Sequence, residues 1–468
     1  MINNLFAYLA RFLFMLSFSL LLSSCQTSKV SQNDSLQFIS AQELFLQKVY
    51  TPGYLSVVQG PTTDKSTSIA LFVPRLKNYE FKVTNQKNEQ ISFQKEKTLE
   101  KESLFWKVEK IYLSDLSPSD NYKLEVIDNF RGYRITVDTR EFKTLNITSS
   151  KAKFALLSCM SDDYRYRPYI GKMWEQLASK NVDFIILNGD VVYVDGFDFV
   201  ARQSATGKDI WQRYIDSMER IPLYHWYHLK PIFATWDDHD FGTNDGDETF
   251  SAKKDSQALF RALFWGKEVP NTYEMAPMGV SSHAKIFGQN FYFMDDRFER
   301  RPNKGFDQDP YGHWGKTQHQ WLLQKAQKNP EPSWIINGDQ FFSFKKLDYK
   351  EAMQMNHPAE FETLLNELKT FSQPFVLLSG DVHFTEITQI PFQSLNYNTY
   401  EITSSSMHSH HRQGWDNPHR LEGTFVNEFN FVLLEVTKSE APQQLEVNAS
   451  SWGLKNEAYF QKQLKIKK

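Results

Sequence analysis

Four short apolar runs in the middle of the chain each end directly in polar side chains that can bind a metal ion. The endings are Leu157-Ser158-Cys159, Asn188-Gly189-Asp190-Val-Val-Tyr193-Val-Asp195, Trp236-Asp237-Asp238-His239-Asp240 and Ser379-Gly380-Asp381-Val382-His383. In an open α/β sheet, ligands bind just beyond the carboxyl ends of the strands. One Gly-Asp ending alone is typical of a turn. Four such endings together predict a cluster of Asp, His, Cys and Tyr side chains at one sheet edge.

The residue types in this cluster suit metal-assisted hydrolysis, and the family resemblance given below implies that the substrate is a phosphate ester. That reaction needs charge neutralisation on the phosphoryl oxygens, an activated water and a proton for the leaving group. Two metal ions about 3.5–4 Å apart can clamp the phosphate and lower the pKa of a bound water. A carboxylate at a strand end is a natural bridging ligand, and we choose Asp190 for this role. Asp381 and His383 occupy alternate positions, so an extended segment points both to the same side.

Buried strands and intervening helices must bring these endings together, and the chain from Lys153 onward predicts both. Fully apolar runs such as Phe184-Ile-Ile-Leu and Phe375-Val-Leu-Leu suit strands that are buried on both faces. Segments with helical spacing lie between such runs, at 168–179, 251–265, 317–327 and 359–371. From about 41 to 145, short alternating runs separated by Pro, Gly, Asn and Asp predict an all-β sandwich instead, in which we find no chemistry.

The motifs resemble those of the calcineurin-like metallophosphoesterases, and specifically of the alkaline phosphatase D (PhoD-type) family. The resemblance covers roughly residues 153–449. Its most specific pieces are Gly189-Asp-Val-Val-Tyr-Val-Asp, Trp236-Asp-Asp-His-Asp and Ser379-Gly-Asp-Val-His-Phe, supported by Asp295-Asp-Arg297 and Glu401-Ile-Thr-Ser-Ser. It implies a four-layer α-β-β-α metallophosphoesterase sandwich preceded by a small all-β domain. In that domain, the stretch from Leu116 to Tyr122 resembles the tyrosine corner of fibronectin type III modules.

The resemblance also implies an activity and a set of metal ligands. The activity is that of a metal-dependent phosphoric ester hydrolase (an alkaline phosphatase or phosphodiesterase) in which metal-bound hydroxide attacks phosphorus in line. The expected ligands of the dinuclear site are Cys159, Asp190, Tyr193, Asp238, Asp381 and His383. The Gly-Asp-x-x-Tyr spacing is that of purple acid phosphatases, in which a tyrosinate binds ferric iron.

The metals that this resemblance favours are Fe³⁺ and Ca²⁺, with a Zn²⁺ or Mn²⁺ pair as the alternative. Cys159 and His383 are expected beside Tyr193 on the iron, with the thiol standing where other metallophosphoesterases use Asp or His. Oxygen-rich ligation by Asp238 and Asp381 suits a hard ion such as Ca²⁺. The alternatives are that Cys159 is a buried core cysteine and that Tyr193 only packs.

Two residues are candidates for roles in catalysis without binding metal. His239 is expected to be the general acid or to stabilise the transition state. Asp237 beside it is instead a candidate hydrogen-bond partner of His239. Arg297 is a candidate phosphate clamp through its planar guanidinium, and the alternative is a surface ion pair with Asp295 or Glu299.

Two further motifs are interpreted without a direct role. Asn337-Gly338-Asp339-Gln340 is another Gly-Asp ending, and we expect it to support the ligands rather than to bind metal. The histidines in Met407-His408-Ser-His410-His411 follow three serines. We interpret them as solvated loop histidines, with a place on the rim of the substrate cleft as the alternative.

The N-terminus predicts export and a lipid anchor. The apolar run 12–22 is too short to cross a bilayer core of about 30 Å, for which a helix needs roughly 20 residues. It suits a signal peptide, and Leu22-Ser23-Ser24-Cys25 resembles the bacterial lipobox, in which the Cys becomes lipidated. Gln26 then favours the outer membrane, facing the periplasm or the cell surface; the alternative is an ordinary signal peptide with an incidental Cys. Cys159 is the only other cysteine, and a lone thiol in an oxidising compartment is explained by burial or metal ligation.

These patterns predict five segments. They are a lipoprotein signal peptide (1–24), a tether (25–40), a β-sandwich accessory domain (41–148), a metallophosphatase catalytic domain (149–456) and a basic tail (457–468), whose Lys-rich part we interpret as a solvated helix end. The formal net charge of −3 provides no global field for nucleic acid, so we expect no specific nucleic-acid binding. The expected substrate is a small phosphate ester or phosphodiester: a nucleotide, a phospholipid head group or a sugar phosphate. The competing hypothesis is a catalytically inactive surface binding lipoprotein of the same fold.

Overall fold

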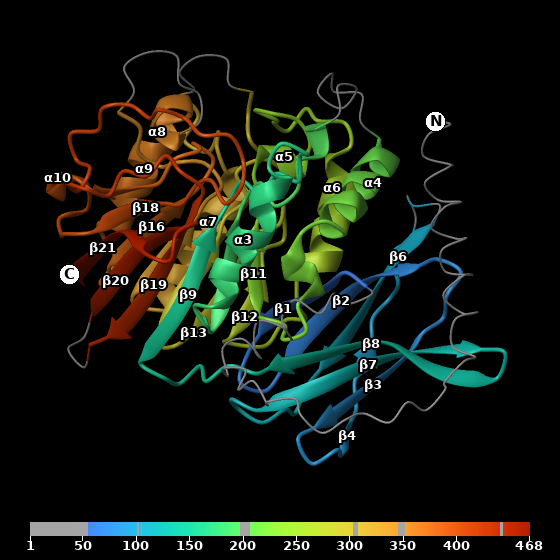
Figure 1. Ribbon diagram of the computed structural model, residues 1–468. Helices are drawn as coiled ribbons and strands as arrows, with labels where there is room; N and C mark the ends of the chain where they lie inside the picture. Colours follow the sequence, from blue (N-terminus) through green and yellow to red (C-terminus); the bar gives the residue numbers. More distant parts are fainter. Residues whose placement is uncertain are drawn as a thin grey trace, which may run out of the picture. The chain divides into compact units, whose positions relative to one another are not determined.

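The computed structural model describes most of the chain after the N-terminal segment (Figure 1). The described residues are 55–100, 103, 105–196, 206–302, 308–344, 352–439 and 443–468. The predicted signal peptide, the lipid-anchor candidate Cys25, the tether and the first part of the sandwich segment (41–54) lie outside these residues.

The N-terminal part of the described chain is the predicted all-β unit. It consists of two antiparallel sheets, ordered β1-β2-β6-β5 and β4-β3-β7-β8. The strands are β1 (Val57–Thr62), β2 (Thr67–Pro74), β3 (Glu80–Asn85), β4 (Gln90–Ile91), β5 (Gln94–Lys95), β6 (Trp106–Leu113), β7 (Asn121–Phe130) and β8 (Tyr133–Lys143). The Oη of Tyr122 accepts a hydrogen bond of 2.8 Å from the backbone N–H of Ser117, which is the contact expected of a tyrosine corner. Membership of the fibronectin type III class stays a prediction.

The remainder of the chain forms an α/β unit with two mixed sheets, as predicted. The first sheet has the order β11-β10-β9-β19-β20-β21, and the second has the order β12-β13-β14-β15-β16-β18-β17. The first contains β9 (Lys151–Leu157), β10 (Phe184–Asn188), β11 (Ile232–Thr235), β19 (Asn430–Lys438), β20 (Gln444–Gly453) and β21 (Ala458–Lys467). The second contains β12 (Tyr273–Met275), β13 (Ser282–Ile286), β14 (Gln289–Phe293), β15 (Ser333–Ile336), β16 (Phe375–Ser379), β17 (Glu386–Gln389) and β18 (Tyr400–Thr403).

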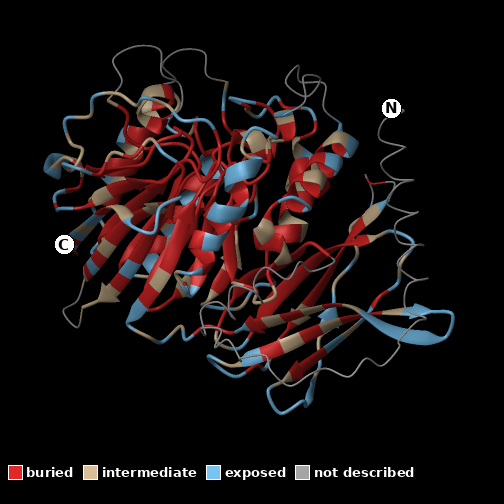
Figure 2. Ribbon diagram, viewed as in Figure 1, coloured by how far each residue is buried: buried red, intermediate tan, exposed pale blue. Residues whose placement is uncertain are grey.

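The two sheets pack face to face, with helices against their outer faces. Side chains from both sheets, including Phe154, Phe184, Phe291 and Trp334, share one buried core. The outer face of the first sheet packs on α3 (Arg167–Ala178), α4 (Gly207–Met218) and α6 (Lys253–Phe264), and that of the second on α7 (Lys316–Lys328) and α9 (Pro358–Leu368). The central strands are therefore buried on both faces (Figure 2), which explains their continuous apolar sequences.

The predicted helices at 168–179, 251–265, 317–327 and 359–371 correspond to α3, α6, α7 and α9, whereas α4 was not predicted. Shorter helical segments are η1 (Val194–Gly196), η3 (Pro222–His225), α5 (Asp238–Phe241), α8 (Met353–Asn356) and α10 (Phe392–Leu395). Within the described ranges, none of the helices combines the length and the apolar character needed to cross a membrane.

The C-terminal tail corrects one prediction. Instead of a solvated helix end, the Lys-rich segment is part of strand β21, which pairs antiparallel with β20 at the edge of the first sheet. Phe460, Leu464 and Ile466 are buried in the core between the sheets, while Lys465 and Lys467 alternate with them on the exposed side. The density of lysines concealed this alternation of period two. Lysines on an edge strand also discourage pairing with another chain.

Candidate metal centre

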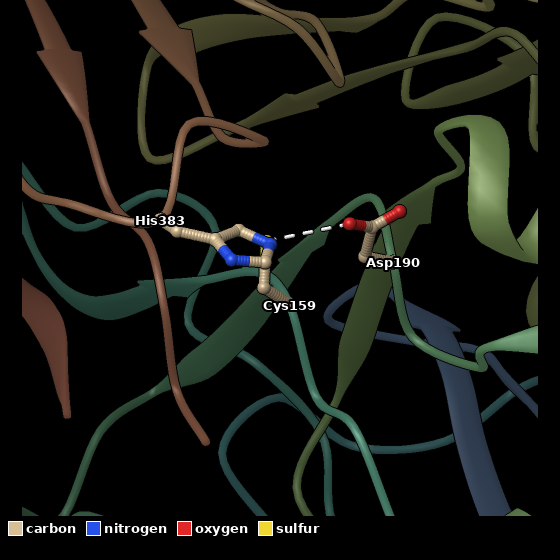
Figure 3. Close-up of side chains that lie close together, drawn as sticks. All are labelled: Cys159, Asp190 and His383. Atoms are coloured by element: carbon tan, nitrogen blue, oxygen red, sulfur yellow. Dashed lines mark hydrogen bonds between the residues drawn. The ribbon is translucent and has the colours of Figure 1, made fainter. Parts of the chain in front are cut away.

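The four polar endings meet at one place, as predicted. Strands β9, β10 and β11 are parallel neighbours in the first sheet, and β16 approaches from the second. The Cys159 thiol donates to Oδ2 of Asp190 over 3.4 Å. Oη of Tyr193 lies 3.3 Å from the same Oδ2 and 3.3 Å from Nε2 of His383. Figure 3 shows Cys159, Asp190 and His383 converging from three separate segments.

Asp190 is the residue that joins two halves of the centre. Its ligand atom lies within 4.8 Å of those of Cys159 and His383 in one group, and of those of Asp237, Asp238 and Asp381 in another. Two carboxylate oxygens can serve two cations, so this position suits a bridging ligand. The first group offers sulfur and nitrogen, and the second offers oxygen alone.

Four of the six predicted ligands have a backbone conformation that is unfavourable for a side chain other than glycine. Cys159, Asp190, Asp381 and His383 have φ values of 55°, 54°, 62° and 60°. The left-handed region costs an L-residue roughly 1–2 kcal/mol. Such strain is typical of functional sites, where the surrounding structure holds it in place. Here this conformation turns the backbone sharply just after a strand ends, and the turn directs the side chain toward the centre.

Burial and mutual repulsion dominate the electrostatics of the centre. Burial raises the pKa of Asp190 and that of Asp381 to about 8, and in both cases the nearby carboxylate of Asp238 adds to the increase. Burial also raises the pKa of the Cys159 thiol, and the charges of Asp190 and Asp381 raise it further. Several acidic groups crowded together in a buried site need positive charge to ionise. The donor set thus fits one or two bound cations.

His239 has a partner that the sequence analysis did not assign. It lies on α5, and its Nδ1 is 2.6 Å from Oδ1 of Asp195 in η1. Its ring also stacks on that of Tyr193, with centroids 4.1 Å apart. The suggestion that Asp237 pairs with His239 is wrong, because the Asp237 carboxylate faces Arg297 instead. The only feature of the sequence that pointed to Asp195 was its position at the end of the motif that begins at Gly189.

Arg297 lies behind the centre and not on the surface. Its side chain is 0% exposed, and its Nε donates to Oδ1 of Asp237 over 2.6 Å. The alternative of a surface ion pair with Asp295 or Glu299 is therefore wrong. The predicted phosphate clamp has no support in this geometry, because the buried guanidinium has no exposed surface from which to contact a ligand.

The Asn337–Gln340 ending lies next to this ion pair. Oδ2 of Asp339 accepts from Nη1 of Arg300 over 2.8 Å, and the Asp339 backbone N–H donates to Asp296. A Cβ at Gly338 would lie 2.7 Å from Cγ of Asp237. The segment thus packs against Asp237 from behind and supplies no atom to the clusters around Asp190, in line with the supporting role expected for it.

The histidine motif after β18 divides into buried and exposed members. His408 is buried; its Nε2 accepts from the indole N–H of Trp174 over 3.0 Å, and its Nδ1 donates to the carbonyl of Ser161. The prediction of a solvated side chain is wrong for His408, because Trp174 on α3 supplies an internal partner. His410 and His411 are exposed. The His410 ring lies 3.8 Å from that of His383, so this residue is on the rim of the centre.

Two mixed sheets with this cluster at the ends of their strands define a metallophosphoesterase-like α/β protein. The family model of the PhoD-like phosphatases matches residues 154–450, and the chain belongs to that family and is a phosphoric ester hydrolase. Both the family and the enzyme class predicted from the motifs are thereby confirmed.

Solved structures provide a comparison of folds. The protein in the solved structure of PhoD shares 17% sequence identity with this chain. The match covers 87% of this chain and 88% of that chain, with a TM-score of 0.62. The purple acid phosphatase PPD1 from yellow lupin (Lupinus luteus) seeds is 12% identical over 88% of this chain and 74% of that chain, with a TM-score of 0.58. At these identities the likeness concerns the fold alone. None of the curated proteins matches the sequence significantly.

Proposed function

We propose that the chain hydrolyses small phosphate monoesters or diesters at a dinuclear metal centre. The observation that carries this proposal is the position of Asp190, which is shared by a sulfur- and nitrogen-containing ligand group and by an all-carboxylate group. The ligands are Cys159, Asp190, Tyr193, Asp238, Asp381 and His383. Bound cations would supply charge neutralisation for the phosphoryl oxygens and would lower the pKa of a coordinated water.

The donor types favour two different ions. Cys159, Tyr193 and His383 form the half that would hold Fe³⁺, because thiolate and phenolate are strongly donating ligands. Asp238 and Asp381 form the half that would hold Ca²⁺, which prefers oxygen ligands. A pair of Zn²⁺ or Mn²⁺ ions is the alternative.

The protein's own residues would handle the proton of the leaving group. Asp195 holds Nδ1 of His239, which leaves Nε2 available to donate to the leaving-group oxygen. Burial lowers the pKa of His239, but the carboxylates of Asp238, Asp190 and Asp195 outweigh this effect and raise it well above its usual range. This direction favours the protonated imidazole, which is the form that a general acid requires. Arg297 neutralises Asp237 and so keeps the segment before α5 in place.

We also propose that the protein is exported and anchored to the outer membrane through a lipid on Cys25. The support is the lipobox-like sequence Leu22-Ser23-Ser24-Cys25. A Cys25→Ser variant should move from the membrane fraction to the soluble fraction of the cell envelope.

Elemental analysis of the natively purified protein, together with its visible spectrum, tests the proposed metals. We expect iron and calcium, a visible absorption from the tyrosinate on iron, and hydrolysis of bis(p-nitrophenyl) phosphate. Tyr193→Phe should bleach the colour, whereas the matched control Tyr169→Phe should keep it. A colourless, iron-free, active enzyme would establish the Zn²⁺ or Mn²⁺ alternative. Absence of both metal and turnover, in protein made with iron and calcium supplied, would support an inactive binding lipoprotein and overturn the proposal.

A further inference from the structure

A hollow of about 370 Å³ opens directly beside the metal centre. Tyr193, Ser409 and His410 line one end of it. The Oη of Tyr193 donates to Oγ of Ser409 over 3.3 Å, and the His410 ring lies against His383. A phosphate ester held at the centre can therefore extend its leaving group into this hollow.

Aromatic side chains line the hollow. Tyr164 and Tyr166 line it together with Tyr193. A second hollow of about 350 Å³ shares Tyr166, Ser409 and His410 with the first and continues over Tyr169 and Phe429. Tyr164 is 72% exposed and Tyr169 is 40% exposed, so packing in the core does not explain these two rings. Tyr166 is half-buried and packs against Phe429. Exposed aromatic rings beside a catalytic centre are suited to stacking on a planar ligand.

The positive charge of the hollow disfavours cationic leaving groups. Four arginines line it against two aspartates, Asp162 and Asp163. Arg213 and Arg220 hold Asp162 at 2.5 Å and 2.6 Å, and Arg165 pairs with Asp163. Both acidic side chains are thus neutralised and the hollow keeps an excess of positive charge. That charge disfavours a cationic head group such as choline, although aromatic rings alone would accept one.

We propose that this hollow is a nucleoside subsite, and that the preferred substrates are nucleotides whose base stacks on the exposed ring of Tyr164. The inference rests on the proposed function and deepens it. Of the three substrate classes considered, sugar phosphates and phospholipid head groups lack the planar π face that this ring can recognise. In the reaction, the oxygen of water forms the new bond to phosphorus and its proton passes to solvent. The bond from phosphorus to the nucleoside oxygen breaks, that oxygen takes the proton from His239, and solvent returns a proton to His239.

Adenosine 5′-monophosphate and ribose 5-phosphate are a matched pair of probes, because they share the phosphate–ribose linkage and differ in the base. We expect the metal-loaded wild-type protein to prefer the nucleotide at least about tenfold in kcat/KM. We expect a similar preference in affinity, measured by isothermal titration calorimetry on metal-loaded His239→Ala protein so that the probes are not consumed during the titration. Tyr164→Ala should reduce that ratio to near one, while Tyr164→Phe should retain it. Tyr133→Ala, an exposed tyrosine of β8 in the β-sandwich, is the control.

The outcomes separate this inference from the proposed function. Turnover of bis(p-nitrophenyl) phosphate with equal binding of the two probes would overturn the subsite alone. A binding preference without turnover of any ester would overturn the proposed hydrolysis and leave the subsite in place. A preference that survives Tyr164→Ala, in a variant with an unchanged Tm, would place the base elsewhere and overturn the assignment.

Discussion

His239 and Asp195 form a close, largely buried pair in which Nδ1 of the imidazole lies 2.6 Å from Oδ1 of the carboxylate. The other carboxylate oxygen of Asp195 accepts a hydrogen bond from the backbone N–H of Asn244. Asp195 thus joins the segment after β10 to the segment after α5. A carboxylate in this position fixes both the orientation of the ring and the atom on which its inner proton lies.

Asp195→Asn should impair catalysis without removing metal. The variant removes one of the negative charges that raise the pKa of His239. A general acid loses activity as the pH rises through its pKa, so the alkaline limb of the kcat–pH profile should move to lower pH. We expect kcat at neutral pH to fall by up to about 100-fold, with unchanged metal content by elemental analysis. Asp247→Asn, at a surface turn outside this pair, is the control. An unmoved alkaline limb would show that Asp195 does not act through His239.

The ion pair between Arg297 and Asp237 gives a prediction about stability. Breaking a buried pair by removing one partner costs about 3–5 kcal/mol, because a charge is left uncompensated. Arg297→Ala should therefore lower the free energy of unfolding by roughly that amount. Arg134→Ala removes an exposed partner of Glu80 and should cost no more than about 1 kcal/mol. Denaturant titrations followed by tryptophan fluorescence measure both.

Two further variants distinguish a supporting role for Arg297 from the phosphate clamp that the sequence suggested. A double variant, Arg297→Met with Asp237→Leu, should recover part of the stability because neither charge remains. A clamp would instead show a raised KM in Arg297→Lys with unfolding unchanged. That result would require the guanidinium to leave Asp237 and reach the cleft.

The sequence predicted that these side chains come together because their positions depend on local chain geometry. Asp190 and Cys159 each follow a buried strand, and parallel strands end at the same edge of a sheet. Neighbouring strand ends therefore bring such residues together whatever path the loops take. For the same reason the apolar runs predicted the two-sheet α/β fold.

Contacts between loops were not predictable in this way. The pairing of Asp195 with His239 depends on how two separate segments turn after their strands, and no periodicity encodes that. Arg297 was interpreted as a phosphate clamp because of its planar guanidinium, or as a surface ion pair, whereas arginines are rarely fully buried. Its burial is compensated by the carboxylate of Asp237, which faces Arg297 and not His239.

Gly189 gives a prediction about the backbone that positions Asp190. Its φ is +81°, and a Cβ there would lie 2.6 Å from Cβ of Asp237. Gly189→Ala should lower the Tm and the metal content together, because the strain of about 1–2 kcal/mol and the clash both displace Asp190. Gly171→Ala is the matched control: this glycine lies in α3 with nothing within 4 Å of its added Cβ. The control should stabilise the helix by up to about 1 kcal/mol. A Gly189→Ala protein with full metal content would contradict the assigned role.

His319 links α7 to α9 and should make stability depend on pH. Its Nδ1 lies 2.9 Å from Oε1 of Glu360 and its Nε2 lies 2.6 Å from Oε2 of Glu367. Burial lowers the pKa of His319, but the two glutamates outweigh it and raise the pKa above the ordinary 6.5. The protonated imidazole is therefore bound more tightly in the folded state. Its stabilising contribution is complete below pH about 6.5 and is lost as the pH rises through the higher pKa of the folded protein.

The measurement is the difference in Tm between the wild type and His319→Gln across a series of pH values. We expect the variant to be less stable at pH 6, and the difference to shrink steadily as the pH is raised, because the wild type loses the charge that holds the two glutamates. His419→Gln, outside this helix pair, serves as the matched substitution and should show no such trend. A difference in Tm that is constant from pH 6 to pH 9 would mean that His319 contributes through packing alone.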